Sequence, residues 1–410
     1  MLLLALRPSL AWADGRRAEL LVFGAGEDVF ERYGHAGLRI LGPAAADDRI
    51  FNFGITDWTK PNYIQDFLTG RVAFWGNVRP WARTRNSYVK WDRTILRYPL
   101  DLTPAEVDAL VVRLEHDVLP ENRNYIYDTF RNNCATRLRD YIDDVTGGAV
   151  RRSLAEEPLG PSYREDVRVA FAAFPSLLIL TEIVPGLPLD AHRSTWERMY
   201  RPAVLGEAIT HVHVTRDGVS RPLTTGPIVD RLREGPEPLT GWPDLGQAIL
   251  GGLAFALAGL ALAIRSARPR RRVAAALLWL VPASLMALLL VTVAVGTVWP
   301  DMQENWLVLA LPVTDLALYV PLIGLLRGRP VRHLRLWRGY LTFRAVTVLL
   351  LAGLGPVWGL LAGPLPPRVL CAAGLLLLAA ALFGPSPPAA VQPAAVPPAA
   401  VPPEVPTHDV

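Results

Sequence analysis

The sequence predicts an α+β extracytoplasmic domain at residues 14–245, followed by an α-helical transmembrane bundle at residues 246–384. Two observations favour this division. The first part mixes charged and apolar residues as a globular domain does, whereas from Ala248 onward the chain is mostly apolar. The mean hydropathy of +0.24 and the 51% share of hydrophobic residues are also too high for an ordinary soluble enzyme. At 410 residues the chain has room for two or three domains.

The two ends of the chain have compositions of their own. Residues 1–13 form a weak signal-like segment, since Ala11-Trp12-Ala13 matches an A-x-A cleavage pattern but the basic start is missing and the apolar core is short. Residues 385–410 are rich in proline and alanine. Such a composition cannot bury enough apolar surface to fold, so a disordered cytoplasmic tail is predicted.

Five apolar stretches in the second part predict five transmembrane helices. Each is close to the length of about 20 residues that crosses a hydrocarbon core. The stretches are 247–264, 273–298, 306–326, 340–362 and 368–384. A buried helix of a globular protein would seldom repeat that length five times with so few charges.

Arginine clusters orient these predicted spans. One cluster lies in 265–272, after the first span, and another in 327–338, after the third. The intervening loops 299–305 and 363–368 are almost free of basic residues. The positive-inside rule therefore places both clusters in the cytoplasm and the N-terminal domain outside. The net charge of +4 thus comes mostly from arginines in the loops between predicted spans. It gives no support to nucleic-acid binding.

Strands are predicted before helices in the soluble part. Runs of β-branched and aromatic residues predict strands at 20–24, 36–41, 49–54 and 94–100. A helix should follow Thr103, because Pro104 suits the first helical position and Glu106 completes a capping box. Another helix is predicted over 135–142, after the cap-type residues Asn132 and Asn133. This order of elements is typical of an α+β domain.

Cys134 is the residue that most strongly indicates chemistry. The other cysteine, Cys371, lies in a predicted span, and an unpaired thiol in an oxidising compartment usually has a function. Cys134 stands at the predicted start of a helix, where the helix dipole and free backbone N–H groups should favour the thiolate. The alternative is a small buried residue at a helix end.

His35 is the candidate general base. It lies at the start of a strand with Gly34 and Gly37 close by, which would let a substrate approach the backbone. In a Cys–His pair, imidazole takes the thiol proton and later protonates the leaving group. A third group must orient the imidazole. Asn52 is the candidate for that role and Asp57 the alternative, while a purely structural role stays open for each residue.

No cofactor is predicted. His211 and His213 have the spacing of a strand pair, but no cysteine or carboxylate completes a metal site. Gly24-Ala25-Gly26 alone does not make a dinucleotide-binding motif. The aromatic residues around the candidate site, Trp58 among them, are expected mainly in the core, with some at a membrane interface.

Three motifs together resemble the DUF4105 domain, the N-terminal periplasmic domain of the bacterial lipoprotein N-acyltransferases called Lnb. They are Tyr-Gly-His-Ala-Gly-Leu-Arg-Ile at 33–40, Phe-Asn-Phe-Gly at 51–54, and the run 125–140 around Cys134. A stretch within 186–205 is similar to the closing motif of the family, so the resemblance spans about residues 18–210.

The resemblance implies a permuted papain-like (NlpC/P60-like) fold, in which the histidine precedes the cysteine along the chain. Cys134 would be the nucleophile and His35 the base, with Asn52 as a loosely matched orienting residue. Substrate or oxyanion support would come from Asn133, Tyr33 and Tyr127. The protein would lie in the bacterial inner membrane, with its catalytic domain on the periplasmic side.

The implied activity moves an acyl chain from a phospholipid to the α-amine of the N-terminal cysteine of a diacylated lipoprotein, through a thioester on Cys134. Its partners would be phospholipid, lipoproteins and the membrane, without nucleic acid. Two other classes stay open. One is a membrane-anchored cysteine amidase or peptidase of the cell envelope, which would need only one anchor. The other is a non-enzymatic lipid-binding or transport protein, for which Asp315 within a predicted span is a possible sign.

Overall fold

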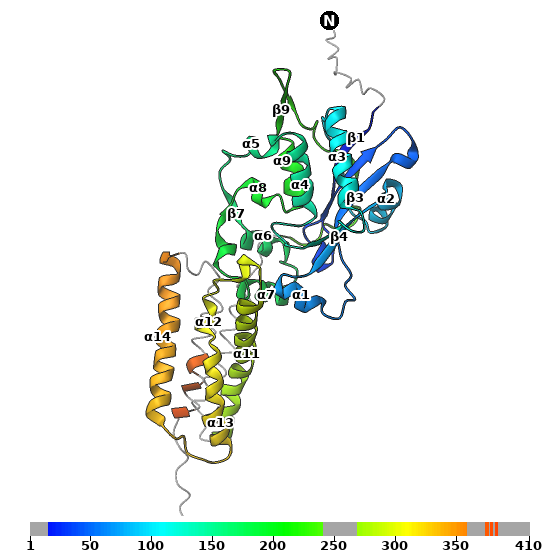
Figure 1. Cartoon of the computed structure of the whole chain (residues 1–410). Coiled ribbons are helices and arrows are strands. Elements are labelled where there is room, and N and C mark those ends of the chain that lie inside the picture. Colours follow the sequence, from blue (N-terminus) through cyan, green and yellow to red (C-terminus); the bar gives the residue numbers. More distant parts are fainter. Residues whose placement is uncertain (1–14, 241–268, 359–373, 377, 380–381, 384–410) are drawn as a thin grey trace, which may run out of the picture.

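The computed structural model describes residues 15–240, 269–358, 374–376, 378–379 and 382–383. Figure 1 shows a mixed α/β domain formed by the N-terminal part and an elongated group of helices that extends from it. The predicted signal-like segment, the predicted span at 247–264 and the predicted tail lie outside the described residues.

A seven-stranded sheet forms the centre of the domain, in the order β11-β5-β1-β2-β3-β4-β6. Every neighbouring pair in it is antiparallel. The strands are β1 (Arg17–Phe23), β2 (His35–Leu41), β3 (Arg49–Ile55), β4 (Ala73–Pro80), β5 (Ile95–Pro99), β6 (Asn124–Ile126) and β11 (Ile228–Arg231). The four predicted strands correspond to β1, β2, β3 and β5, so the expectation of a mixed domain with an early group of strands is confirmed.

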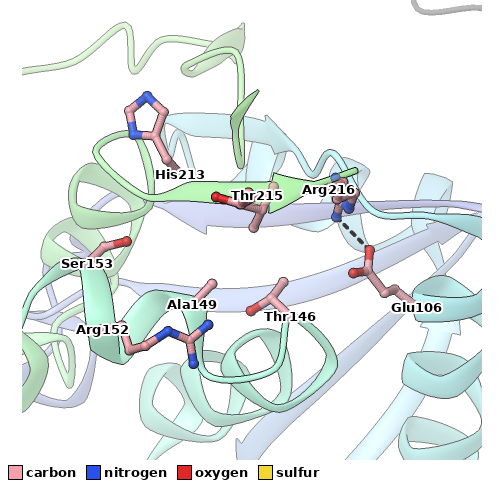
Figure 2. A pocket seen from close by; sticks show the side chains of 9 residues that line it. Glu106, Thr146, Ala149, Arg152, Ser153, His213, Thr215 and Arg216 are labelled. Carbon is pink, nitrogen blue, oxygen red and sulfur yellow. Dashed lines mark hydrogen bonds and ion pairs between the residues drawn. The ribbon is translucent and has the colours of Figure 1, made fainter. Parts of the chain in front are cut away.

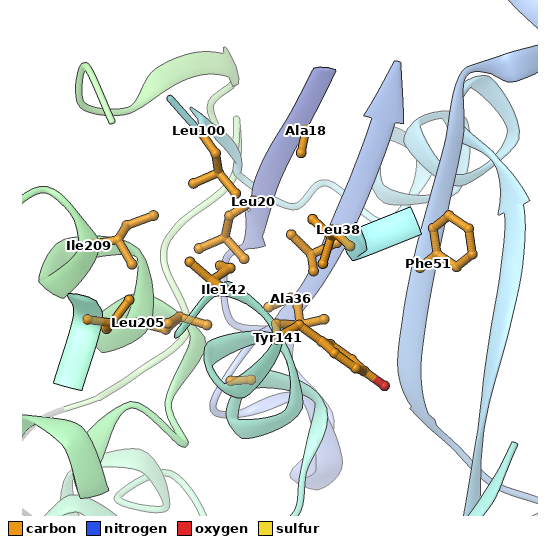
Figure 3. Packing of buried hydrophobic residues seen from close by; sticks show 14 of the residues in the cluster. Ala18, Leu20, Ala36, Leu38, Phe51, Leu100, Tyr141, Ile142, Leu205 and Ile209 are labelled. Carbon is orange, nitrogen blue, oxygen red and sulfur yellow. The ribbon is translucent and has the colours of Figure 1, made fainter. Parts of the chain in front are cut away.

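Helices cover both faces of the sheet. Three of them, α3 (Pro104–Asp117), α4 (Cys134–Val145) and α9 (Pro202–Ile209), pack on one face, and α2 (Trp81–Lys90) packs on the other. Side chains alternate along a strand, so Leu20 of β1 joins the larger core while Leu21 joins the smaller one beneath α2. Figure 3 shows the larger core, in which Leu20, Leu38 and Phe51 of the sheet face Tyr141, Ile142, Leu205 and Ile209 of the helices.

Capping residues fix where two of these helices begin. The Thr103 side chain accepts from the Glu106 N–H and the Glu106 carboxylate accepts from the Thr103 N–H, which is the predicted capping box. Of the two cap-type residues Asn132 and Asn133, Asn133 caps α4. The remaining elements of the domain are α1 (Tyr63–Thr69), α5 (Ala149–Ser153), β7 (Gly160–Ser162), α6 (Tyr163–Ala170), α7 (Pro175–Ile183), β8 (His192–Arg193), α8 (Thr195–Arg198), β9 (His213–Arg216), β10 (Val219–Pro222) and short 3-10 turns such as η1 (Val29–Glu31).

Among the described residues of the second part, two segments are long and apolar enough to cross a membrane, Arg270–Gly296 and Pro300–Leu326. They coincide with the spans predicted at 273–298 and 306–326. The first is α11 (Pro269–Gly296), and the second is broken into η4 (Pro300–Met302), α12 (Leu307–Ala310), η5 (Val313–Leu318) and α13 (Tyr319–Leu326). A further helix, α14 (Leu334–Trp358), covers most of the span predicted at 340–362.

A buried ion pair joins α14 to this second segment. The Arg344 guanidinium donates to both carboxylate oxygens of Asp315, at 3.0 and 3.1 Å, and to the carbonyl oxygens of Leu309 and Ala310. The Tyr340 hydroxyl also donates to Asp315, at 2.5 Å. Asp315, whose position in a predicted span could indicate transport, is therefore fully engaged in holding helices together.

The loop between α11 and α12 contacts the α/β domain at several points. The Val298 N–H donates to the Thr69 carbonyl at the end of α1, at 3.0 Å. The Asn305 side chain donates to two carbonyls at the end of α7. Arg131 donates to both carboxylate oxygens of the buried residue Asp301, one of them at 2.9 Å. The loop and the domain thus lie on the same side of the two spans, which agrees with the topology that the arginine clusters predict.

Candidate active site

Cys134 is the first residue of α4 and is a free, half-buried thiol. Asn133 builds the start of that helix. Its Oδ1 accepts from the N–H groups of Ala135 and Thr136, at 2.9 and 3.0 Å, and its Nδ2 donates to the carbonyls of Thr129 and Tyr200. With all of these groups occupied, Asn133 acts as a helix cap that fixes the position of the thiol.

The thiol lies against the beginning of β2. The backbone N–H of Ala36, the residue after His35, is close enough to the Cys134 sulfur to lower the pKa of the thiol. Gly54 of β3 also lies close to Cys134, since a Cβ added to Gly54 would be 3.4 Å from the Cys134 Cβ. Gly54 has a φ of +90°, a conformation that glycine adopts without strain. The fold therefore brings the predicted nucleophile next to the strand position that carries the predicted base.

His35 is oriented by Asn52, as the sequence suggested. The His35 Nε2 and Asn52 Oδ1 are 3.4 Å apart, and Asn52 is buried on the neighbouring strand. The tautomer with its proton on Nε2 donates to Asn52 and leaves Nδ1 as an acceptor for another proton. Asp57, the alternative, is instead exposed and accepts from the backbone N–H and hydroxyl of Thr59.

An aromatic stack supports the His35 ring. The ring of Phe23 lies parallel to it at a centroid distance of 5.9 Å, and Tyr88 stacks on Phe23 at 3.7 Å. The guanidinium of Arg93 lies over the Tyr88 ring at 5.2 Å. Arg93 is buried, donates to the Gly24 carbonyl and pairs with Glu31 at 3.1 Å. It thus ties together the two ends of the segment that leads from β1 to His35.

The electrostatics correct one expectation. Burial raises the pKa of the Cys134 thiol to about 11, outweighing the backbone N–H groups of Ala36 and Ala135 that lower it. Burial also lowers the pKa of His35 to about 4, and the positive charge of Arg93 lowers it further. The prediction of a thiolate was therefore wrong for the resting site, because desolvation exceeds the effect of the helix start. Burial thus favours the neutral forms of both the Cys134 thiol and the His35 imidazole.

Two predicted supporting residues lie in different surroundings. Tyr127 stacks on Phe74 at 4.1 Å and packs in the same core as Cys134. Its hydroxyl pKa is raised by burial and by the proximity of Cys134. Tyr33 instead packs edge-on against Tyr200, at 5.3 Å, in a separate aromatic cluster. Tyr127 is thus placed close to the thiol, whereas Tyr33 shapes the segment that precedes His35.

The Cys134 N–H is the first N–H group of α4. The next two N–H groups of the helix are already occupied by Asn133. The Cys134 N–H, by contrast, lowers the pKa of its own thiol, so it lies near the atom at which a tetrahedral intermediate would form.

A pocket of about 190 Å³ lies elsewhere in the domain, between α5 and β9. Figure 2 shows that Arg216, which lines it, pairs with Glu106. Both charges are engaged there, since Glu106 also belongs to the capping box of α3. None of the predicted site residues lines this pocket. Among the described residues, no three His, Cys, Asp or Glu side chains are close enough to hold a metal ion.

Arg93 is the site residue that sequence reasoning missed. It directly precedes a strand, where an arginine is ordinarily exposed, so no sequence pattern distinguishes it. Its charge favours the thiolate of Cys134 and disfavours the imidazolium of His35.

Replacement of Arg93 by glutamine should raise both pKa values. We expect alkylation of Cys134 near pH 7 to slow by about tenfold, the equivalent of one pKa unit. The rate is measured on the Cys134 peptide over a range of pH. Arg93→Lys should keep most of the rate, and Arg85→Gln, which removes a cation paired with Asp230, should leave it unchanged. Equal slowing in Arg85→Gln would contradict a specific role for Arg93.

One known family matches the part of the chain that contains this site. Residues 14–169 match the Lnb N-terminal periplasmic domain. The match begins just before β1, ends within α6, and includes Cys134, His35 and Asn52. No curated protein and no solved structure matches the chain. Residues 14–169 thus form an Lnb-like periplasmic domain, and the described residues that follow include two segments apolar enough to cross a membrane.

Proposed function

We propose that this protein is a thiol-dependent lipoprotein N-acyltransferase of the bacterial inner membrane. It moves an acyl chain from a phospholipid to the α-amine of the N-terminal cysteine of a diacylated lipoprotein. The main support is the free thiol of Cys134, held beside the strand that begins with His35, in an Lnb-like domain docked on apolar helices. A helix bearing the cysteine against an antiparallel sheet bearing the histidine also suits a permuted papain-like arrangement.

The first step transfers the acyl chain to the enzyme. The neutral His35 takes the thiol proton through Nδ1 while the Cys134 sulfur attacks the carbonyl carbon of a phospholipid ester. The Cys134 N–H stabilises the negative oxygen of the tetrahedral intermediate. As the C–O bond breaks, the imidazolium returns the proton to the leaving oxygen. Lysophospholipid leaves, and an acyl thioester stays on Cys134.

The second step transfers the acyl chain to the lipoprotein. Its neutral α-amine attacks the thioester carbonyl, and His35 takes a proton from the amine nitrogen. The C–S bond breaks as the amide bond forms, and the thiolate recovers a proton from His35. No redox change occurs in either step, so the scheme needs no oxidant, reductant or cofactor.

The full reaction tests this proposal. We expect the protein in phospholipid vesicles to convert a synthetic diacylated lipopeptide into a triacylated one, with one lysophospholipid released per product. Mass spectrometry measures both products. Cleavage of cell-wall peptides without lipopeptide acylation would support a cysteine amidase instead. If neither reaction occurs with well-folded protein, a lipid-binding role without catalysis is favoured.

The two steps should differ in their dependence on pH. Because the His35 pKa is lowered to about 4, the imidazole stays a competent base above that pH. Formation of the thioester should therefore be nearly constant between about pH 5 and 8 and be lost as the pH falls through about 4. Discharge by lipopeptide should instead rise through the amine pKa of about 7.7–8.0. Single-turnover rates measured separately for each step check this, and a midpoint near 6.5 for the first step would contradict it.

A further inference from the structure

Three large apolar side chains near the candidate site are exposed. Phe30, Trp58 and Ile64 have exposed fractions of 59%, 48% and 67%. The rings of Phe30 and Trp58 lie 4.1 Å apart, so the first two form one surface although they are distant in sequence. Trp58 also contacts Tyr63, the neighbour of Ile64, at 4.9 Å. The three side chains are called the apolar rim below. Grouped exposure of this kind marks an interaction surface.

The apolar rim borders the candidate active site. Phe30 lies in η1, in the segment that leads to His35, and the neighbouring residue Glu31 pairs with Arg93. Trp58 follows the strand that carries Asn52 and Gly54. The two segments that bear the predicted base and its orienting residue therefore both contribute to the rim.

Ring contacts lead inward from the rim. The Trp58 ring meets Phe74 edge-on at 6.3 Å. Phe74 in turn stacks on Tyr127, which packs in the core that includes Cys134. A continuous apolar environment thus extends from the exposed rim to the surroundings of the nucleophile.

The rim also lies near the end of a candidate membrane span. Gly296 ends α11, and its carbonyl accepts from Arg71 at 3.1 Å, while the Phe67 ring of α1 packs edge-on against Trp299 at 5.1 Å. Ile64 is five residues before Thr69, the end of α1, a separation of about 7.5 Å at the helical rise. The headgroup region on each side of a bilayer is about 5–8 Å thick. Figure 1 shows α1 at the edge of the domain beside α11.

We propose that the apolar rim inserts into the periplasmic leaflet of the membrane and receives the phospholipid that acylates Cys134. This assignment of the donor route rests on the proposed acyltransferase function. The partner of the rim is a phospholipid bilayer, because the rim lies beside the contact between α1 and the end of α11, the candidate membrane span.

Photocrosslinking tests the membrane contact without relying on activity. A benzophenone amino acid replaces Ile64 in the full-length protein in phospholipid vesicles, with Cys134→Ala present so that no acyl transfer can occur. We expect cross-links to phospholipid at Ile64. Val112 on α3 is a matched control, since it is 69% exposed but lies on a helix that packs against the sheet rather than the bundle. Lipid cross-linking at Ile64 that is absent, or no stronger than at Val112, would overturn the proposal. When a diacylated lipopeptide is added to the vesicles, cross-links to the lipopeptide alone would also overturn it.

A kinetic measurement tests delivery of the donor. In the protein with Cys134 intact, Trp58→Ser combined with Ile64→Ser should raise the phospholipid concentration that half-saturates acylation of Cys134 by about tenfold, which corresponds to about 1.4 kcal/mol. The maximal rate should change little, because neither side chain touches the reacting atoms. An unchanged half-saturation would refute delivery by the rim. Cross-linking of lipid at Ile64 in a protein that forms no thioester would instead refute the proposed function and leave the membrane contact standing.

Discussion

Replacing Cys134 with alanine should abolish acyl transfer while leaving the protein folded and inserted in the membrane. The loss should reach about 10⁴-fold or more, since removal of a covalent nucleophile leaves only binding and oxyanion contacts. Folding should persist because Asn133, rather than the thiol, caps α4. Lipoprotein acylation in vesicles measures the loss, and thermal unfolding of the solubilised protein measures the folding.

Two further variants separate the nucleophile from its surroundings. Cys134→Ser should be nearly as inactive, because a hydroxyl is a much weaker nucleophile than a thiol unless its site is built to activate it. His35→Ala should remove the base and give a comparable loss while the thiol stays present. Normal lipoprotein acylation by a well-expressed Cys134→Ala protein would contradict the mechanism. Normal acylation by His35→Ala would show that His35 is not the general base.

Replacing Asp315 with leucine should be the most destabilising change in the helical part. It leaves the Arg344 cation buried among apolar helices without its carboxylate. Loss of one partner of a buried ion pair costs about 3–5 kcal/mol, so we expect a marked drop in the unfolding temperature. Thermal unfolding in detergent, followed by gel filtration, provides the measurement.

The double variant is the matched control for this change. Asp315→Leu combined with Arg344→Leu removes both charges and should recover most of the lost stability, because no unpaired charge stays buried. A single Asp315→Leu variant as stable as the unchanged protein would show that the pair does not hold the helices together. A functional role for Asp315, such as transport, would then regain support.

Much of the fold could be predicted from local sequence patterns. β1, β2, β3 and β5 appear as β-rich runs, and the capping residues Thr103 and Asn133 mark the starts of α3 and α4. β6 has three residues and β11 four, too few for a periodic signal. β11 also pairs with β5 across a long stretch of chain, and such a pairing has no local signature.

The candidate site was predictable in its residues but not in its electrostatics. A glycine-flanked histidine and a cysteine at a helix start have sequence signals. The structure places Asn52 3.4 Å from His35, and Cys134 close to Ala36, the residue after His35. Burial depends on tertiary packing, so the raised pKa of the thiol could not be predicted. Arg93 escaped notice for the same reason, since its burial and its bond to Gly24 arise only in the folded domain.

The acyl-enzyme is the most direct test of the proposed chemistry. The protein is incubated with phospholipid alone, and the peptide that contains Cys134 is examined by mass spectrometry. We expect an adduct heavier by one fatty acyl chain, removed by hydroxylamine because thioesters react with that amine, and discharged by a diacylated lipopeptide. The adduct should be absent in His35→Ala. An unmodified Cys134 in folded protein that still acylates lipoproteins would contradict a covalent route through this thiol.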